Sequence, residues 1–245
     1  MRFLYGEPAI FHKGALIIGD THFGIEQRLQ SRGIHYSDIS EQMYEKIISL
    51  IRKTKAKKII MLGDVKENIM AVDSITERIF ERLQKKIQII VTRGNHDGGI
   101  ESVCANVEPS SGMVYEKLAL VHGNAWPDKE LMKQRYVVSG HQHPQIEMRD
   151  RAGKVHRESA WIVLPAAKTS IKKFYKKFND KISLILMPAF NPLVGNTLKI
   201  NAEEQLGPLL SNKLFKLNEA LVYRLDGTQL GKLKDMQQKQ ILSDG

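Results

Sequence analysis

The residues best suited to chemistry stand just after an apolar run near the start of the chain, in segment 15–22. The run has the character of a strand, and Asp20 and His22 follow it with one residue between them. A carboxylate and an imidazole so spaced at the end of a strand can both turn toward one metal ion. Alone, the pair is weak evidence, because many strands end in a polar loop. Four later segments contain groups that could complete such a site.

Each of those later segments also follows an apolar run and has a glycine beside its polar groups. Glycine lets the backbone turn sharply, and ligands bind at the carboxyl ends of strands in open α/β sheets. We therefore expect the groups to meet on one rim. The candidate metal ligands are Asp20, His22, Asp64, Asn95, His122, His141 and His143. The alternative is five unrelated polar turns, but with His96 the segments contain five of the eight histidines, which favours a common site.

The donor set indicates the kind of metal. Mixed nitrogen and oxygen ligands favour manganese, iron, cobalt, nickel or zinc over magnesium and calcium, which prefer oxygen. The set is large enough for two ions, and a shared carboxylate can hold them ~3.5–4 Å apart. Such a pair polarises a phosphoryl oxygen and generates hydroxide at neutral pH. We expect two divalent ions, with manganese as the first choice.

The elements that must position these groups follow from the hydrophobic pattern. Segments 15–19, 58–62 and 87–91 are apolar and predict buried strands, while 38–53 and 73–85 predict amphipathic helices. Strands that alternate with helices of this length predict right-handed crossovers and a parallel sheet portion. The candidate helix N-caps are Ser37 or Asp38 for the first helix and Ser74 for the second.

The second half of the chain predicts shorter elements. Strands are expected at 113–116, 119–121, 136–139, 183–187 and 220–225. Segments 146–148 and 161–164 flank a turn at 150–153 and predict a hairpin. A short helix is expected at 127–134, and segment 23–36 is expected to be irregular. The prediction is one domain over 1–231 and a polar tail over 232–245.

Composition narrows the class of protein. The chain has 245 residues, of which 42% are hydrophobic and 26% charged, as in soluble globular proteins. Cys104 is the single cysteine, so no intramolecular disulfide is possible, which suits a reducing compartment. Segment 1–13 lacks the apolar core of a signal peptide, and no run approaches a membrane span. We expect a cytoplasmic protein without membrane association; its oligomeric state is not predictable from these features.

The net charge of +10 favours a polyanionic partner. A lysine-rich surface also serves solubility, and it is typical of proteins from hot environments, in which lysine and glutamate are enriched. Charge alone therefore leaves nucleic-acid binding open.

The order of motifs from Asp20 to His143 resembles the calcineurin-like metallophosphoesterase superfamily. The motifs are Asp-x-His, Gly-Asp, Gly-Asn-His-Asp, His-Gly and Gly-His-x-His. The resemblance implies an α/β/β/α sandwich of two mixed β-sheets flanked by helices, with two metals at the rim. It implies that Asp20, His22 and His143 bind the first metal, that Asp64 bridges, and that Asn95, His122 and His141 bind the second. It also implies that His96 protonates the leaving oxygen or holds the phosphate.

A narrower resemblance concerns the residues after the first motif. Segment 20–26, followed by Leu29, Arg32, Gly33 and Ile34, is similar to archaeal phosphoesterases related to SbcD. It is also similar to the PdeM-like ligase-associated DNA damage response endonucleases of bacteria. The resemblance implies phosphodiester cleavage in DNA repair, with DNA as partner and a repair helicase or ligase as a further partner.

Glu67 stands three residues after Asp64, where the superfamily often has a second aspartate. A carboxylate there can pair with the catalytic imidazole and raise its pKa. We predict that Glu67 orients His96 in this way. The alternative is a glutamate in a solvent-exposed loop.

The candidate nucleic-acid contacts are Arg28, Arg32, Lys172, Lys173, Lys176 and Lys177. The four lysines are interleaved with Phe174, Tyr175 and Phe178, a pattern that can stack bases and neutralise phosphates. The alternative, slightly favoured, is an amphipathic segment with its aromatic side chains inward and its lysines solvated.

Three classes of function follow. The first is a metal-dependent phosphodiesterase or nuclease acting on DNA, which charge and the narrower resemblance favour. The second is a phosphatase or phosphodiesterase acting on small nucleotides or cyclic nucleotides. The third is a scaffold without activity, against which the complete ligand set argues.

Overall fold

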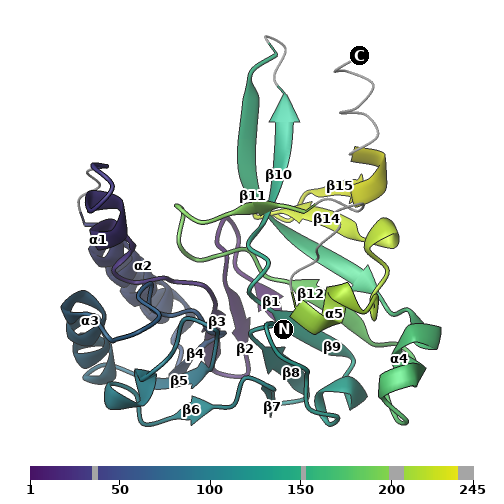
Figure 1. The fold of residues 1–245 in the computed structure, drawn as a ribbon, viewed down its shortest axis with the longest axis horizontal. Coiled ribbons are helices and arrows are strands. Elements are labelled where there is room, and N and C mark those ends of the chain that lie inside the picture. The colour runs from purple at the N-terminus through teal and green to yellow at the C-terminus, as the bar shows by residue number, and fades with distance from the viewer. Residues whose placement is uncertain (35–37, 150–152, 199–206, 237–245) are drawn as a thin grey trace.

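Two β-sheets packed face to face form the centre of the molecule, and helices cover the outer face of each (Figure 1). The computed structural model describes residues 1–34, 38–149, 153–198 and 207–236. This architecture confirms the predicted α/β/β/α sandwich of two mixed sheets. In the described ranges, no helix has the length and apolar character needed to cross a membrane.

The first sheet contains the three strands that lead to the first metal-binding motifs. Its strands, in spatial order, are β1 (Arg2–Phe3), β2 (Ile10–His12), β3 (Ala15–Ile18), β4 (Lys58–Met61), β5 (Gln88–Thr92) and β6 (Val107–Glu108). Strands β1 to β3 are antiparallel, and β3 to β6 are parallel. The parallel portion confirms the crossovers predicted from alternating strands and helices, and it places the carboxyl ends of β3, β4 and β5 at one edge.

The second sheet is mixed and larger. Its strands are β7 (Met113–Tyr115), β8 (Leu118–Val121), β9 (Tyr136–Ser139), β10 (Pro144–Arg149), β11 (Val155–Pro165), β12 (Ser183–Leu186), β13 (Asn196–Thr197), β14 (Leu221–Arg224) and β15 (Gln229–Lys232). Strands β8, β9 and β12 run parallel, so β8 and β9 also end side by side. A hairpin forms between β10 and the first part of β11, where Gln145 pairs with Ser159 and Met148 with His156, and it projects from the body of the molecule (Figure 1). The prediction is correct for 146–148 but wrong for 161–164, which pairs with β12 and β14 instead. Residues 150–152 of the predicted turn lie outside the described residues.

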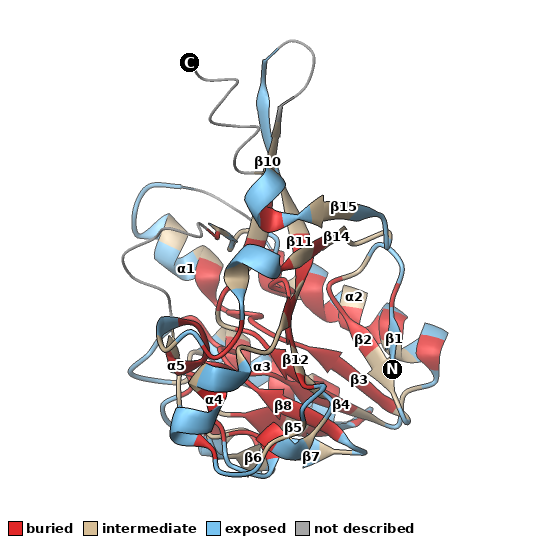
Figure 2. Cartoon of the chain, turned by 90° about the vertical axis from the view of Figure 1, so that its right-hand side faces the viewer, coloured by how far each residue is buried: buried red, intermediate tan, exposed pale blue. Residues whose placement is uncertain are grey.

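Helices cover both outer faces. They are α1 (Ile25–Gln30), α2 (Ile39–Thr54) and α3 (Ser74–Gln84) on the first sheet, and α4 (Lys168–Phe174) and α5 (Gly207–Ser211) on the second. Short 3-10 turns occupy Ile100–Ser102, Leu131–Lys133 and Leu217–Glu219. Helix α4 has an exposed outer surface over the buried strands (Figure 2), whereas Pro208, Leu209 and Leu210 of α5 are buried.

Strands that are apolar on both faces explain the layering. In β3, Leu16 and Ile18 pack with the helices of the first sheet, while Ala15 and Ile17 point into the space between the sheets. Successive side chains of a strand point to opposite faces, so a continuous apolar run can fill two cores at once. The layer between the sheets fixes the two sets of strand ends relative to each other.

Two helix predictions need correction. Segment 23–36 is not irregular throughout, because α1 forms where buried Ile25 and partly buried Leu29 stand four residues apart. The N-cap of α3 is Asp73 and not Ser74, since the Asp73 carboxylate accepts hydrogen bonds from the backbone N–H groups of Ile75 and Thr76. For α2, Asp38 makes no capping bond through its side chain, and Ser37 lies outside the described residues.

The helix predicted at 127–134 is wrong except for the short turn at Leu131–Lys133. A tertiary contact replaces the helical hydrogen bonding of its first residues, because the Pro127 carbonyl accepts a hydrogen bond from the Tyr175 hydroxyl. The predicted tail also begins too early. Lys232 belongs to β15 and Leu233 is buried, while residues 237–245 lie outside the described ranges.

Candidate metal centre

Five strand ends converge where the two sheets meet. Strands β3, β4 and β5 of the first sheet and β8 and β9 of the second lead directly into the predicted motifs. The loops after β3 and β4 are tied together, because His22 N–H donates to the Asp64 carbonyl at 2.9 Å. Thr21 adds a bond from its hydroxyl to the Val65 carbonyl at 2.9 Å. Five separate motifs are thus held on one rim.

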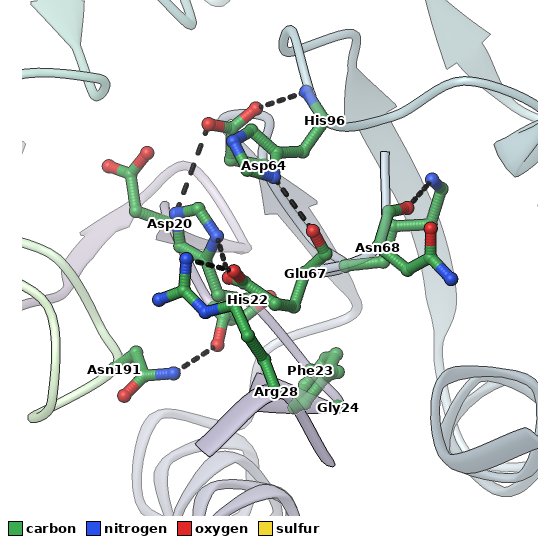
Figure 3. Close-up of polar contacts among 12 residues, drawn as sticks. Asp20, His22, Phe23, Gly24, Arg28, Asp64, Glu67, Asn68, His96 and Asn191 are labelled. Carbon is green, nitrogen blue, oxygen red and sulfur yellow. Dashed lines mark hydrogen bonds and ion pairs between the residues drawn. The ribbon is translucent and has the colours of Figure 1, made fainter. Parts of the chain in front are cut away.

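The side chains gather into two groups that share Asp64. Potential ligand atoms of the first group lie within 4.8 Å of one another, and so do those of the second. The first group is Asp20, His22, Asp64 and His143, and the second is Asp64, His122 and His141. Asn95 extends the second group, since its Oδ1 lies 3.2 Å from Nε2 of His122. Figure 3 shows Asp20, His22 and Asp64 directed toward one another.

Backbone donors fix the carboxylates. Asp20 accepts hydrogen bonds from the His141 N–H at 3.1 and 3.2 Å, which joins the rim of one sheet to the rim of the other. Asp64 accepts from the His96 N–H at 2.9 Å. Asp20 is fully buried and Asp64 nearly so. Their oxygen atoms are therefore held in place before any ion binds.

The imidazoles are oriented by their outer nitrogens. Nδ1 of His122 lies 2.8 Å from the Leu62 carbonyl, which can only accept, so Nδ1 carries the proton and Nε2 faces Asp64 and Asn95. Nδ1 of His22 lies 2.9 Å from Glu67, which directs its Nε2 toward Asp64. Such outer partners set the tautomer of metal-binding histidines. The inner nitrogens then point into the two groups, where they can bind a metal ion once they are deprotonated.

Several of these residues have a backbone conformation that residues with a Cβ rarely adopt. Positive φ values occur at Asp20 (55°), His22 (43°), Asp64 (46°), His141 (69°) and His143 (45°). Each such residue costs of order 1–3 kcal/mol, and such residues cluster at functional sites. The surrounding hydrogen bonds must hold these turns in place.

The sequence predicts that the carboxylate of Glu67 pairs with His96, and this prediction is wrong. The carboxylate binds Nδ1 of His22 at 2.9 Å and the guanidinium of Arg28 at 2.7 Å. The backbone carbonyl of Glu67 accepts instead from Nδ1 of His96 at 2.9 Å (Figure 3). Glu67 is also buried, which excludes the solvent-exposed alternative. Arg28, predicted to contact nucleic acid, is engaged by Glu67 and leaves 48% of its side chain exposed.

Two buried residues that sequence reasoning missed support the rim. Asp97 is fully buried and accepts from the backbone N–H groups of Asp64 (2.8 Å), Val65 (2.9 Å) and Gly94 (2.7 Å). Lys66 is also fully buried, and its ammonium group donates to the Asn68 carbonyl and, at 3.2 Å, to the Ile69 carbonyl. The only sequence feature that could have indicated a role for Asp97 is its position directly after Asn95 and His96.

The crowding of charges shifts several pKa values of the metal-free protein. Burial opposes the charged form of His122, but the hydrogen bond to Asp64 and the charges of Asp20 and Asp64 raise its pKa to about 9. Burial and the neighbouring His122 lower the pKa of His141 to about 4. Burial opposes ionisation of Asp20, yet His143 and His122 lower its pKa. The cluster therefore combines two ionised carboxylates with imidazoles.

The residues fit divalent metal ions. In the part of the chain that the structure describes, the buried Nε2 of His22 has no hydrogen-bond partner and lies 3.8 Å from Oδ2 of Asp64. Two buried carboxylates with unprotonated imidazole nitrogens form the mixed donor set typical of transition metals and zinc. Asp20, His22, Asp64 and His143 would hold one ion, and Asp64, Asn95, His122 and His141 a second.

The predicted nucleic-acid contacts lie on the surface. Arg32 is exposed after α1, and the four lysines Lys172, Lys173, Lys176 and Lys177 are exposed at the end of α4 and beyond it. The inward alternative holds for Tyr175, which is buried, but not for Phe174, which is 48% exposed. The segment is therefore only partly amphipathic.

A family model for the calcineurin-like phosphoesterases matches residues 15–150, which is more than half of the chain. The chain thus belongs to the calcineurin-like phosphoesterase family and is a metal-dependent hydrolase of phosphoester bonds. The match spans the motifs from Asp20 to His143 and confirms the superfamily that they resemble.

One solved structure supports the fold. The Pseudomonas putida nuclease MPE is similar over 93% of this chain and 94% of its own, with 20% identity and a TM-score of 0.57. Yfce, a phosphoesterase from E. coli, is similar over 58% of this chain and 76% of its own, with 20% identity and a TM-score of 0.38. No match was found among curated proteins.

Proposed function

We propose that this protein is a two-metal phosphodiesterase that cleaves DNA, with manganese as its working ion. The observation that carries the proposal is the position of Asp64, whose carboxylate belongs to both ligand groups. A carboxylate shared in this way can hold two ions ~3.5–4 Å apart, the spacing of two-metal hydrolytic sites. When bound, the metals supply charge stabilisation to the phosphoryl group and activate water.

His96 has the geometry of a proton donor to the departing oxygen. Its Nδ1 faces the Glu67 carbonyl, which can only accept, so Nδ1 keeps a proton in both states of the ring. Nε2 is then the atom that gains and loses a proton. The ring centroids of His96 and His22 are 5.0 Å apart, which places His96 beside the first ligand group. His96 is partly exposed and can meet a substrate at the rim.

Three observations support DNA as the substrate. The chain has a net charge of +10, which favours polyanions. Arg32 and the four lysines near α4 are exposed. The Pseudomonas putida protein of similar fold carries the name nuclease. A role in DNA repair, with a helicase or ligase as partner, is proposed on the resemblance of segment 20–34 alone.

The test compares three substrates under one set of conditions. Bis-p-nitrophenyl phosphate, p-nitrophenyl phosphate and a single-stranded oligodeoxynucleotide are each assayed with Mn²⁺, Zn²⁺, Co²⁺, Ni²⁺ and Mg²⁺. We expect the diester and the oligonucleotide to be cleaved, best with Mn²⁺, and Asp64→Asn to lose both metal and turnover. Hydrolysis of the monoester or of cyclic nucleotides without cleavage of DNA at any salt concentration would replace this proposal with a small-nucleotide enzyme.

A further inference from the structure

Two large aromatic side chains meet on the surface and stay half exposed. The ring centroids of Trp126 and Phe174 are 4.7 Å apart, with 39° between the ring planes. Despite this contact, 41% of Trp126 and 48% of Phe174 remain exposed, whereas Trp161 is 3% exposed. Scattered exposed hydrophobic residues are ordinary on a protein surface, but adjoining aromatic faces there indicate an interaction site.

Buried contacts hold this pair rigidly. The hydroxyl of Tyr175 donates to the carbonyl of Pro127 at 2.8 Å, which ties the loop that carries Trp126 to the end of α4. The rings of Trp126 and Tyr175 are also in contact, with centroids 6.4 Å apart. Asp128 N–H donates to the Ser111 carbonyl at 2.9 Å on the other side of the loop. A surface fixed in this way loses little entropy when a ligand stacks on it.

The pair lies near the metal centre. Trp126 is four residues after His122, one of the candidate ligands. A chain of four residues spans at most about 14 Å, because each residue extends ~3.3–3.6 Å. A strand of nucleic acid whose scissile phosphate lies at the metals can therefore reach the pair.

Positive charge surrounds the pair without a matching number of acids. The lysines concerned are Lys172, Lys173, Lys176 and Lys177, all exposed. Among the described residues, none of the four has an ion-pair partner. Two of the nearby acids are engaged elsewhere, since Asp180 lies 3.9 Å from Lys168 and Glu130 pairs with Lys133. The exposed Asp128 is also nearby, and it leaves the four lysines in excess.

We propose that Trp126 and Phe174, with the four lysines, form a stacking platform for a single-stranded polynucleotide that extends from the metal centre. The proposal rests on the proposed function and adds where the substrate binds. Unstacked bases place their faces on the aromatic rings, and the lysines neutralise the phosphates between them. A duplex fits poorly, because its bases already stack on one another. A protein partner is disfavoured, since lysines are depleted at protein interfaces.

The two tryptophans provide a direct measurement. The chain contains Trp126, which is exposed, and Trp161, which is buried, so a base stacked on the platform quenches the emission of Trp126 alone. The protein is titrated with dT12 and rU12 whose phosphates are phosphorothioates, which slow cleavage. We expect quenching by the single strands, and no quenching in Trp126→Phe, which keeps an aromatic ring for binding.

Affinity variants complete the test, with an oligonucleotide carrying a fluorophore. Phe174→Ala is expected to weaken binding roughly 5- to 160-fold, since stacking on one aromatic side chain contributes that much per base. Replacing the four lysines by glutamine is expected to reduce the slope of log affinity against log salt by ~0.7 for each phosphate that is no longer neutralised. Tyr5→Ala is the matched control, because Tyr5 is an aromatic residue 77% exposed in the turn after β1, the edge strand of the first sheet.

The outcomes separate this inference from the proposed function. If the wild type cleaves DNA but Phe174→Ala binds as tightly as Tyr5→Ala, the platform is refuted and the enzyme remains a DNA phosphodiesterase. If the platform binds rU12 and not dT12, the inference stands and the DNA substrate fails. A parallel fall in cleavage of oligonucleotide and of bis-p-nitrophenyl phosphate in Phe174→Ala would indicate damage to the metal centre and overturn the platform.

Discussion

Asp97→Ala is the substitution with the clearest expected effect outside the metal ligands. The carboxylate is fully buried and accepts three backbone N–H groups, at 2.8, 2.9 and 2.7 Å, from two separate loops. An unsatisfied buried donor costs about 1–3 kcal/mol. Three such donors, partly rehydrated in the space left by the side chain, give an expected loss of about 3–5 kcal/mol.

The assay is thermal and urea unfolding of the protein loaded with Mn²⁺. For a protein of 150–250 residues, 1 kcal/mol shifts Tm by about 2–4 °C, so Asp97→Ala should lower it by roughly 6–20 °C. Because Asp97 also holds the backbone of Asp64, the affinity for metal should fall roughly 10- to 100-fold, as for other residues that orient ligands.

Two variants make the result specific. In Asp97→Asn the remaining oxygen can still accept two of the three donors, so we expect about one third of the loss in free energy of unfolding. Asp128→Ala is the matched control, because Asp128 accepts one backbone N–H group, from Glu130 at 2.8 Å, but is exposed. If Asp97→Ala melts within 2 °C of Asp128→Ala, at an experimental precision of about 1 °C, and binds metal normally, the three bonds do not support the rim.

Three further predictions concern the site itself. His96→Ala should retain both metals and lower kcat for DNA about 10²- to 10⁴-fold, as expected for loss of a proton donor; loss of metal in elemental analysis would contradict this role. Glu67→Gln should weaken Mn²⁺ binding about 10- to 100-fold in a calorimetric titration, because His22 loses its charged partner, while Glu77→Gln on α3 should change nothing. In chelated protein His122 has a pKa raised from 6.5 to about 9, so its contribution to stability is present below pH 6.5 and lost as pH rises through 9. Thermal unfolding with chelator across this interval measures that loss, and a constant Tm would show that His122 is not charged.

The clustering of the candidate ligands was predictable from sequence because each of them follows an apolar run and stands in a distinctive short motif. Strand ends in a parallel sheet share one edge, so five motifs could be assigned to one rim before their distances were known. The fold class followed from the same runs. Leu16 and Ile17 face opposite cores in β3, which is what an uninterrupted apolar strand implies.

The supporting residues were not predictable in the same way. A lysine in a loop is expected to be exposed to solvent, yet the side chain of Lys66 is buried. For Glu67, the motif spacing indicates the correct neighbour but the wrong atom, since the carbonyl and not the carboxylate contacts His96. The direction of a backbone carbonyl depends on the local φ and ψ angles, and residue type does not determine those angles at Glu67.

That dependence on the backbone has a consequence for how the centre is maintained. Asp20, His22 and Asp64 have positive φ, which side chains with a Cβ disfavour by of order 1–3 kcal/mol each. Local preference therefore opposes the conformation that brings these ligands together. Hydrogen bonds between loops offset this cost in free energy. Asp97 accepts from the backbone N–H of Asp64, and the amide of Asn191 donates to the Thr21 carbonyl at 2.9 Å. We therefore expect substitution of Asp97 or Asn191 to weaken metal binding, although neither residue is a candidate ligand.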